Sequence, residues 1–237
     1  MRLLEDLTLN KLLTQFKRLA LSAAVLIAAL SCVGAAQAAG GQHYLVTITN
    51  LTKGQIFSPA VVASHSEDAE PLFVPGHPAS PELAKVAEDA VLDDLISQLS
   101  HEADVLDVKV LEGINGPILP GETASVEVEG LGNHRYVSLV AMLVTTNDAF
   151  VGVSNVAAPA NGDVALMAPA YDAGSEANTE ACSDIPGPPC GSPGVRVTEG
   201  AEGYVYIHPG ISGIGDLAPS MLDWRNPVAR ITIERAK

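Results

Sequence analysis

The sequence predicts a mainly β protein, an antiparallel β-sandwich of about eight strands with one or two short helices. About eight extended segments, several with alternating apolar and polar residues, are joined by Gly- and Pro-rich turns. Apolar residues make up 47% of the chain but aromatic residues only 4%, so the core must be aliphatic and rich in β-branched side chains, which favour sheets. A chain of 237 residues with no internal repeat or low-complexity linker fits one domain of this kind.

Each expected strand is a run of β-branched and apolar residues between turn residues. Pro59 favours an edge or bulge for its strand over a central position, because proline cannot donate a ladder hydrogen bond. Residues 135–146 are almost wholly apolar, which predicts a strand buried on both faces. The expected strands span residues 43–52, 56–65, 105–112, 123–130, 135–146, 163–171, 203–210 and 228–236.

One region has helical rather than alternating spacing. Apolar residues recur at intervals of three and four between residues 81 and 103, which predicts two short helices or one bent helix packed on the sheet. Ser80 is the expected N-cap, since a serine before Pro81 is typical of a helix start.

The N-terminus predicts export. Residues 1–38 have basic residues, then the apolar run LALSAAVLIAAL, then Ala36-Gln37-Ala38, which is typical of a signal peptide cleaved after Ala38. The run is too short for a comfortable membrane span, so we expect no transmembrane segment in the mature chain. Cys32 leaves open lipoprotein attachment as an alternative. The expected division is a signal peptide over 1–38 and one domain over 39–237, in a periplasmic or extracellular protein.

The charge of the chain excludes one class of partner. The formal net charge is −15, and the expected mature chain, with nine basic and 26 acidic residues, carries −17. A surface of this sign is repelled by phosphate backbones, which excludes nucleic acid as a partner on electrostatic grounds. Divalent cations and basic partners fit the charge better.

Export also determines how the cysteines are interpreted. Once Cys32 is removed with the leader, Cys182 and Cys190 remain as an even pair in an oxidising compartment, which predicts a disulfide. A metal-binding or reactive thiol pair is the alternative, but neither a C-x-x-C spacing nor nearby histidines accompany it.

Three carboxylates lie close to loops and are candidate calcium ligands. Asp148 follows the apolar run, and Asp172 and Glu176 flank Gly174, where the chain can curl so that both side chains face one centre. Asn178 could add a carbonyl oxygen. The alternative is that these are solvated residues of acidic loops, which composition and spacing alone slightly favour.

Several motifs in order resemble those of the spondin N-terminal domain family, of the F-spondin and mindin type, which includes single-domain exported bacterial members. The similarity extends from about Tyr44 to Arg235. The motifs are VTITNLTKGQIFSP, TNDAFVG, PAYDAGSEAN, the cysteine pair, HPGISGIGDL and DWRNPVARITI. The resemblance implies a C2-like β-sandwich that binds Ca²⁺ through acidic residues, and it places the three acids of the family on Asp148, Asp172 and Glu176.

The chain departs from the family pattern at two positions in this candidate site. Ala149 stands where animal members have an aromatic residue, and Glu176 stands where they have an aspartate. The additional methylene of Glu176 moves its carboxylate outward, so this is the ligand whose position we expect to differ most.

The resulting functional prediction is a secreted calcium-binding spondin domain that acts as an extracellular binding or adhesion module and not as an enzyme. Its partner would be an extracellular or cell-surface protein or glycan. Two alternatives remain: an exported hydrolase using His208, Ser212 and Asp216, and a purely structural envelope or matrix component. The hydrolase has little support because no G-x-S-x-G elbow is present.

Overall fold

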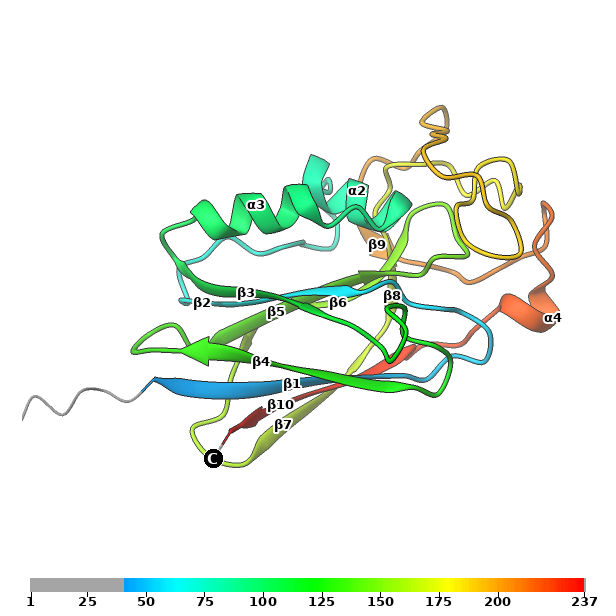
Figure 1. The fold of residues 1–237 in the computed structure, drawn as a ribbon. Helices are drawn as coiled ribbons and strands as arrows, with labels where there is room; N and C mark the ends of the chain where they lie inside the picture. The colour runs from blue at the N-terminus through cyan, green and yellow to red at the C-terminus, as the bar shows by residue number, and fades with distance from the viewer. Residues whose placement is uncertain (1–40, 237) are drawn as a thin grey trace, which may run out of the picture. The chain divides into compact units, whose positions relative to one another are not determined.

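The computed structural model describes residues 41–236, which fold into two antiparallel β-sheets packed face to face (Figure 1). The mainly β antiparallel sandwich that the sequence predicts is therefore confirmed. One sheet has the strand order β4-β1-β10-β7 and the other β3-β2-β5-β6-β8-β9. The strands are β1 (Gln42–Asn50), β2 (Ala60–His65), β3 (Val105–Leu111), β4 (Thr123–Gly130), β5 (Tyr136–Met142), β6 (Ala149–Ala157), β7 (Asp163–Ala168), β8 (Ala170–Asp172), β9 (Tyr206–Ile207) and β10 (Ala229–Arg235).

The described residues thus form ten strands, not the expected eight or so, mainly because one predicted segment divides and one turn region continues as a strand. Residues 163–171 were expected to form a single strand, but they cross from one sheet to the other at Pro169. Proline cannot donate to a sheet ladder, so the strand ends there and β8 begins in the second sheet. Residues 149–157 form β6, the long strand on which the candidate site is built.

The core lies between the two sheets and follows the alternation of the sequence. In β1, Tyr44, Val46 and Ile48 are buried and point into the sandwich. On the opposite face of β1, hydroxyl groups form hydrogen bonds with β4; the hydroxyl oxygens of Thr47 and Ser125 are 2.8 Å apart. Burying an aliphatic side chain of this size contributes about 1.5 to 3 kcal/mol, so the inner face of β1 is a principal source of stability.

The six-stranded sheet is covered on its outer face by two helices, α2 (Pro81–Asp89) and α3 (Asp93–His101). Because both of its faces are covered, β5 is buried along almost its whole length, as the apolar run predicts. Ser80 caps α2, since its Oγ accepts a hydrogen bond from the Leu83 backbone N–H at 3.1 Å. Ala90, at a φ of 56°, ends the helix. The helical region is therefore two short helices. A third, α4 (Pro219–Leu222), lies near the C-terminus.

The edge or bulge expected at Pro59 is wrong on both counts, because the strand is an interior one and its register shift lies at Ser64/His65. Strand β2 lies between β3 and β5, as the second of the six strands of its sheet. The proline is compatible with this position because the strand begins only at Ala60, so no ladder hydrogen bond is required from Pro59.

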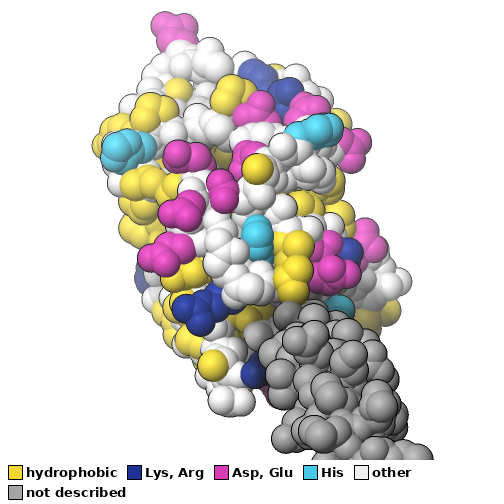
Figure 2. Space-filling view, turned by 90° about the vertical axis from the view of Figure 1, so that its left-hand side faces the viewer, with side chains coloured by type: hydrophobic (Ala, Val, Ile, Leu, Met, Phe, Trp, Pro, Cys, Tyr) yellow, Lys and Arg dark blue, Asp and Glu magenta, His cyan; other side chains and the backbone are white. Residues whose placement is uncertain are grey.

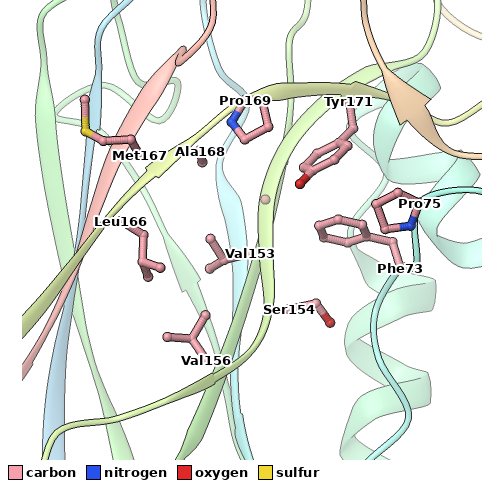
Figure 3. Close-up of a pocket in the computed structure, with 11 residues that line it drawn as sticks. Phe73, Pro75, Val153, Ser154, Val156, Leu166, Met167, Ala168, Pro169 and Tyr171 are labelled. Carbon is pink, nitrogen blue, oxygen red and sulfur yellow. The ribbon is translucent and has the colours of Figure 1, made fainter.

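An apolar hollow of about 370 Å³ opens beside the two sheets (Figure 3). Leu166 of β7 and Val153 of β6 line one part of it, and the rings of Phe73 and Tyr171, 4.8 Å apart, line another. These rings belong to a second apolar cluster, which also includes the inner faces of α2 and α3.

Acidic side chains are spread over the face of the molecule in Figure 2, where basic ones are fewer. None of the helices in residues 41–236 is long and apolar enough to cross a membrane. The expected signal peptide, its cleavage site and Cys32 lie outside the described residues.

Candidate metal centre

Asp148 is positioned by the turn that joins β5 to β6. The Thr146 hydroxyl donates to the Leu143 carbonyl at 2.6 Å and accepts from the Ala149 N–H at 3.0 Å, which fixes this turn. The apolar run of the sequence therefore ends in a polar turn, and Asp148 lies buried immediately before β6.

Asp172 is brought beside Asp148 by strand pairing. In the antiparallel β6–β8 ladder, Ala149 pairs with Asp172, and the Ala173 N–H donates to the Asp148 carbonyl at 3.1 Å. Two carboxylates that are 24 positions apart in the sequence thus become neighbours inside the protein. Both residues are fully buried.

The turn after β8 wraps around these two carboxylates. Gly174, with φ of +67°, donates its N–H to Asp172 Oδ1 at 2.7 Å. The next two backbone N–H groups, of Ser175 and Glu176, both donate to Asp148 Oδ2, at 2.8 and 2.9 Å. The sequence predicts that the chain curls at Gly174, and this turn directs three backbone N–H donors toward Asp148 and Asp172.

Asp148 has an incomplete set of partners. Its Oδ2 accepts three hydrogen bonds, the third from the Ser175 hydroxyl at 3.2 Å, but its Oδ1 is buried with no hydrogen-bond partner. Burial and the adjacent Asp172 carboxylate raise the pKa of Asp148 to about 8. Burial likewise raises the pKa of Asp172 to about 6. The ring of His208 lies nearby, with its Nε2 3.8 Å from Asp172 Oδ2, but burial lowers the pKa of His208 to about 4, so at neutral pH it brings no positive charge to the pair.

Glu176 lies close in sequence, but its carboxylate faces other groups. Its Oε1 accepts from the Val197 N–H at 3.3 Å. Burial, and then the carboxylate of Glu88 on α2, raise the pKa of Glu176 to about 7, while Arg196 acts in the opposite direction. Among residues 41–236 no three His, Cys, Asp or Glu side chains are grouped as a metal would require. The structure brings Asp148 and Asp172 together and places the Glu176 carboxylate among different neighbours.

Asn178, the expected carbonyl ligand, is bound within a hydrogen-bond chain. Its Nδ2 donates to Asp172 Oδ2 at 2.6 Å and to the Tyr206 hydroxyl at 3.0 Å. His208 Nδ1 accepts from the Gly210 N–H at 3.0 Å, so its Nε2 donates to Asn178 Oδ1 at 3.1 Å. Burial lowers the pKa of His208 to about 4, which agrees with this neutral tautomer.

The three residues of the hydrolase alternative each have a different partner. His208 bonds Asn178, the Ser212 hydroxyl donates to Glu180 at 2.8 Å, and an Asp216 carboxylate oxygen accepts from the Cys182 N–H at 2.9 Å. No hydrogen bond joins any two of the three in the described structure. Each of these three side chains instead bonds a group in a different segment of the chain.

Sequence reasoning missed Glu180, which is the most fully bonded of these acids. Both of its carboxylate oxygens are engaged by the loop 212–214, through Ser212 N and Gly213 N, each at 2.6 Å, Ile214 N at 3.1 Å, and the Ser212 hydroxyl. Burial acts to raise the pKa of Glu180, but these hydrogen bonds together lower it below its usual value. The signal in the sequence was HPGISGIGD, whose glycines allow successive N–H groups to converge on an anion.

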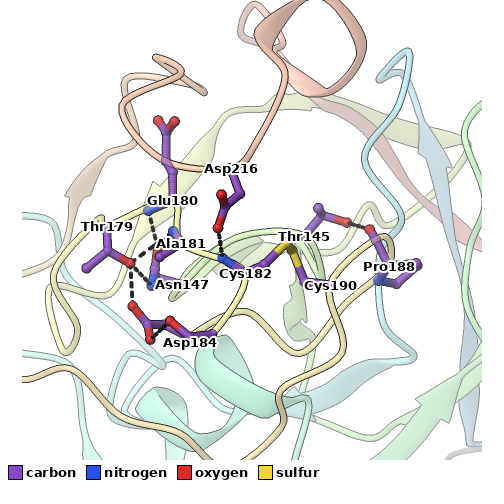
Figure 4. Close-up of a disulfide and its surroundings, with 11 residues drawn as sticks. Thr145, Asn147, Thr179, Glu180, Ala181, Cys182, Asp184, Pro188, Cys190 and Asp216 are labelled. Carbon is purple, nitrogen blue, oxygen red and sulfur yellow. Dashed lines mark hydrogen bonds between the residues drawn. A yellow bond between two sulfur atoms is a disulfide. The ribbon is translucent and has the colours of Figure 1, made fainter.

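The disulfide that the sequence predicts is confirmed: Cys182 and Cys190 are bonded (Figure 4). Two hydrogen bonds attach the loop that it closes, and the segment just before that loop, to the turn that carries Asp148. Thr145 donates to the Pro188 carbonyl at 2.8 Å, and Asn147 Oδ1 accepts from the Glu180 N–H at 3.3 Å. The bridge therefore lies beside the turn that carries Asp148.

A family model, Spondin_N, matches residues 48–179. The chain belongs to the Spondin_N family. This match covers more than half of the chain and includes all three candidate acids, but it ends before the cysteine pair and before HPGISGIGDL and DWRNPVARITI, which the wider sequence resemblance includes. No curated protein sequence matches the chain. The family and the disulfide are consistent with a secreted protein.

Proposed function

We propose that the chain is a secreted spondin domain that binds Ca²⁺ at Asp148 and Asp172 and acts as a binding or adhesion module outside the cell. One observation supports the ion site above all: a buried carboxylate oxygen of Asp148 has no hydrogen-bond partner and lies beside a second buried carboxylate. Removing charge from water without a partner is costly, so this pair is suited to a cation.

The donor set has the chemistry that calcium prefers. Calcium takes six to eight oxygen ligands, from carboxylates, backbone carbonyls and water. Asp148 and Asp172 would supply carboxylate oxygens, and a bound ion would supply the positive charge that the pair lacks. The N–H groups of Gly174, Ser175 and Glu176 hold the remaining lone pairs of these carboxylates, so the chain's own contribution is orientation.

Glu176 would contribute only after its carboxylate leaves the Val197 N–H. We therefore expect it to contribute less to affinity than either aspartate. This assignment keeps the family's three positions but ranks them, with Asp148 and Asp172 as the centre and Glu176 as a supplementary ligand.

Calorimetric titration of the mature protein with CaCl₂ tests the proposal. We expect a dissociation constant in the range of extracellular sites, from about 10⁻⁶ to 10⁻³ M. Asp148→Asn and Asp172→Asn should each abolish measurable binding, and Glu176→Gln should weaken it by about tenfold or less. Asp163→Asn, at the exposed start of β7, is the matched control and should leave binding unchanged.

Two results would contradict the proposal: no heat of binding at millimolar calcium, or unaltered binding in the Asp148→Asn variant. Calcium-independent thermal stability would instead favour the purely structural alternative. Labelling by a serine-reactive probe, absent after Ser212→Ala, would favour the hydrolase.

A further inference from the structure

A second hollow, of about 390 Å³, lies beside the candidate metal centre and is separate from it. It is lined by Tyr206 of β9, by the loop 209–214 and by residues around Asp223. Asn178 lies between the hollow and the metal centre. Its Nδ2 donates both to Asp172 of the metal centre and to the hydroxyl of Tyr206, which lines the hollow. The candidate calcium ligands Asp148 and Asp172 do not line this hollow.

The walls of the hollow are partly apolar. Pro209, Ile211 and Ile214 contribute to them, and Ile214 is 73% exposed. An isoleucine this exposed is in contact with water in the free protein. It becomes buried when an alkyl chain packs on it, which is favourable. The hollow therefore has a surface suited to a chain of methylene groups.

Two carboxylates with remaining acceptor capacity also line the hollow. Glu202 Oε1 accepts from the Tyr206 hydroxyl at 2.9 Å, which positions the group but leaves its second oxygen available. Asp223 Oδ1 accepts from the Ile211 N–H at 3.0 Å, and its Oδ2 pairs with Arg225. A carboxylate has about four lone-pair sites, so both groups can accept more hydrogen bonds.

A third carboxylate adds charge to the hollow without acceptor capacity. Glu180 lines it, but the loop 212–214 already engages both of its oxygens. Against three carboxylates stands one basic side chain among the lining residues, Arg225, whose side chain is 84% exposed. The lining of the hollow is therefore net negative, and the guanidinium of its one basic residue pairs with Asp223 and donates to the Trp224 carbonyl at 2.8 Å.

We propose that this hollow binds the side chain of a lysine from a basic partner protein. The ammonium would donate to Glu202 and Asp223, and the four methylenes would pack on Ile211 and Ile214. A lysine suits the site because its head is a compact charge with three donors on a flexible apolar stem. The net charge of −15 supports a basic partner, since opposite charge accelerates encounter and selects against acidic partners.

Arg225 makes the proposal specific. In the free protein its guanidinium pairs with Asp223, so it competes with the incoming ammonium for the same carboxylate. Removing Arg225 should therefore strengthen binding, whereas removing Glu202 should weaken it. A purely apolar pocket predicts no effect of either change.

The test is NMR titration of the ¹⁵N-labelled protein with Nα-acetyl-lysine amide, at constant ionic strength. We expect saturable shifts of the amides of residues 210–214, with a dissociation constant of about 1 mM. The Nε-acetylated analogue, which lacks the charge, should produce none. Glu202→Gln should weaken binding about threefold and Arg225→Gln should strengthen it about threefold, within the range of partly exposed ion pairs.

Two matched variants control for overall charge. Glu199→Gln, on the same exposed loop as Glu202 but outside the hollow, and Arg230→Gln, on β10, should leave the dissociation constant unchanged. The titrations are run both with calcium and with a chelator, and the comparison of variants is made within one buffer. This inference can therefore fail while calcium binding at Asp148 and Asp172 succeeds, and the reverse.

The proposal is overturned if the acetylated analogue binds as well as the amine, or if Glu202→Gln and Glu199→Gln behave alike. Shifts confined to residues 148 and 172–178 would also overturn it, because they would place the amine at the metal centre.

Discussion

Two buried acids in neighbouring loops, Glu180 and Asp148, have opposite hydrogen-bonding environments. Glu180 receives four hydrogen bonds that engage both carboxylate oxygens, and its pKa is lowered. Asp148 receives three on one oxygen and none on the other, and its pKa is raised. The protein stabilises the charge of Glu180 with its own N–H groups, whereas one carboxylate oxygen of Asp148 is left without a hydrogen-bond partner.

The difference originates in the two glycine-containing turns. The loop around Glu180 contains Gly213, at φ of +81°, and Gly215, where an added Cβ would come within 2.4 Å of the Glu180 backbone. This close approach is what brings three N–H groups onto one carboxylate. The turn at Gly174 divides its donors between two carboxylates, Asp148 and Asp172, and leaves Asp148 Oδ1 without a partner. The comparison therefore separates an acid whose hydrogen bonds are complete from the acid that we propose binds the ion.

The largest effect is expected from Glu180→Ala. Truncation leaves the N–H groups of Ser212, Gly213 and Ile214 without their acceptor, and buried donors without partners are costly. We expect the free energy of unfolding to fall by about 3 kcal/mol, measured by urea denaturation in the presence of calcium.

Glu199→Ala, at an exposed position nearby, is the control for Glu180→Ala and should change stability by less than about 0.5 kcal/mol. A loss no larger at Glu180 than at Glu199 would show that the loop 212–214 does not depend on this carboxylate, and the contrast with Asp148 would disappear.

The sequence was sufficient to predict the sandwich and most of its strands, but not β6 or the division of residues 163–171, and only part of the site. Strand positions follow from alternation, which is local, and Ser80 and the cysteine pair are likewise recognisable from nearby residues. The proximity of Asp148 and Asp172 also follows once β6 and β8 are known to pair. The partners of Glu176 and Glu180 could not be predicted, because they come from irregular loops, at Val197 and at residues 212–214, whose path no periodicity encodes.

Gly174→Ala should produce the next largest effect and tests the turn at the metal centre. An added Cβ would come within 2.3 Å of the Tyr204 carbonyl oxygen, and φ is +67°. Gly203→Ala is a matched control, since Gly203 has φ of +81° but open space around its Cβ position. Both variants incur the cost of a positive φ, about 1 kcal/mol, and only Gly174→Ala adds the clash.

We therefore expect Gly174→Ala to lose about 2 kcal/mol or more of stability, and to lose calcium affinity, because the clash displaces the N–H groups of Ser175 and Glu176 from Asp148. Gly203→Ala should retain affinity. Thermal denaturation and calorimetric titration of the two variants measure both effects. Equal losses in the pair would mean that the turn moves freely and does not orient Asp148.

The last effect, which is the smallest when taken per unit of pH, is a change in how stability depends on pH. The folded pKa of Asp148, about 8, lies above its ordinary value of 3.8, so the folded state holds this proton more tightly than the unfolded state does. Its contribution to stability is therefore complete below about pH 4 and is lost as the pH rises to about 8. Asp172, raised to about 6, acts in the same direction over a narrower range.

In chelator, the free energy of unfolding should fall between pH 5 and pH 8, and Asp148→Asn should reduce this fall by about 1 kcal/mol per pH unit, because the amide cannot ionise. Calcium should have the same flattening effect on the unmodified protein, since the ion replaces the proton as the positive partner of the pair. The same substitution at the exposed Asp163 should leave the slope unchanged. If Asp148→Asn and Asp163→Asn give the same slope, the Asp148 carboxylate is solvated in solution, and it no longer differs from an ordinary acid of the surface.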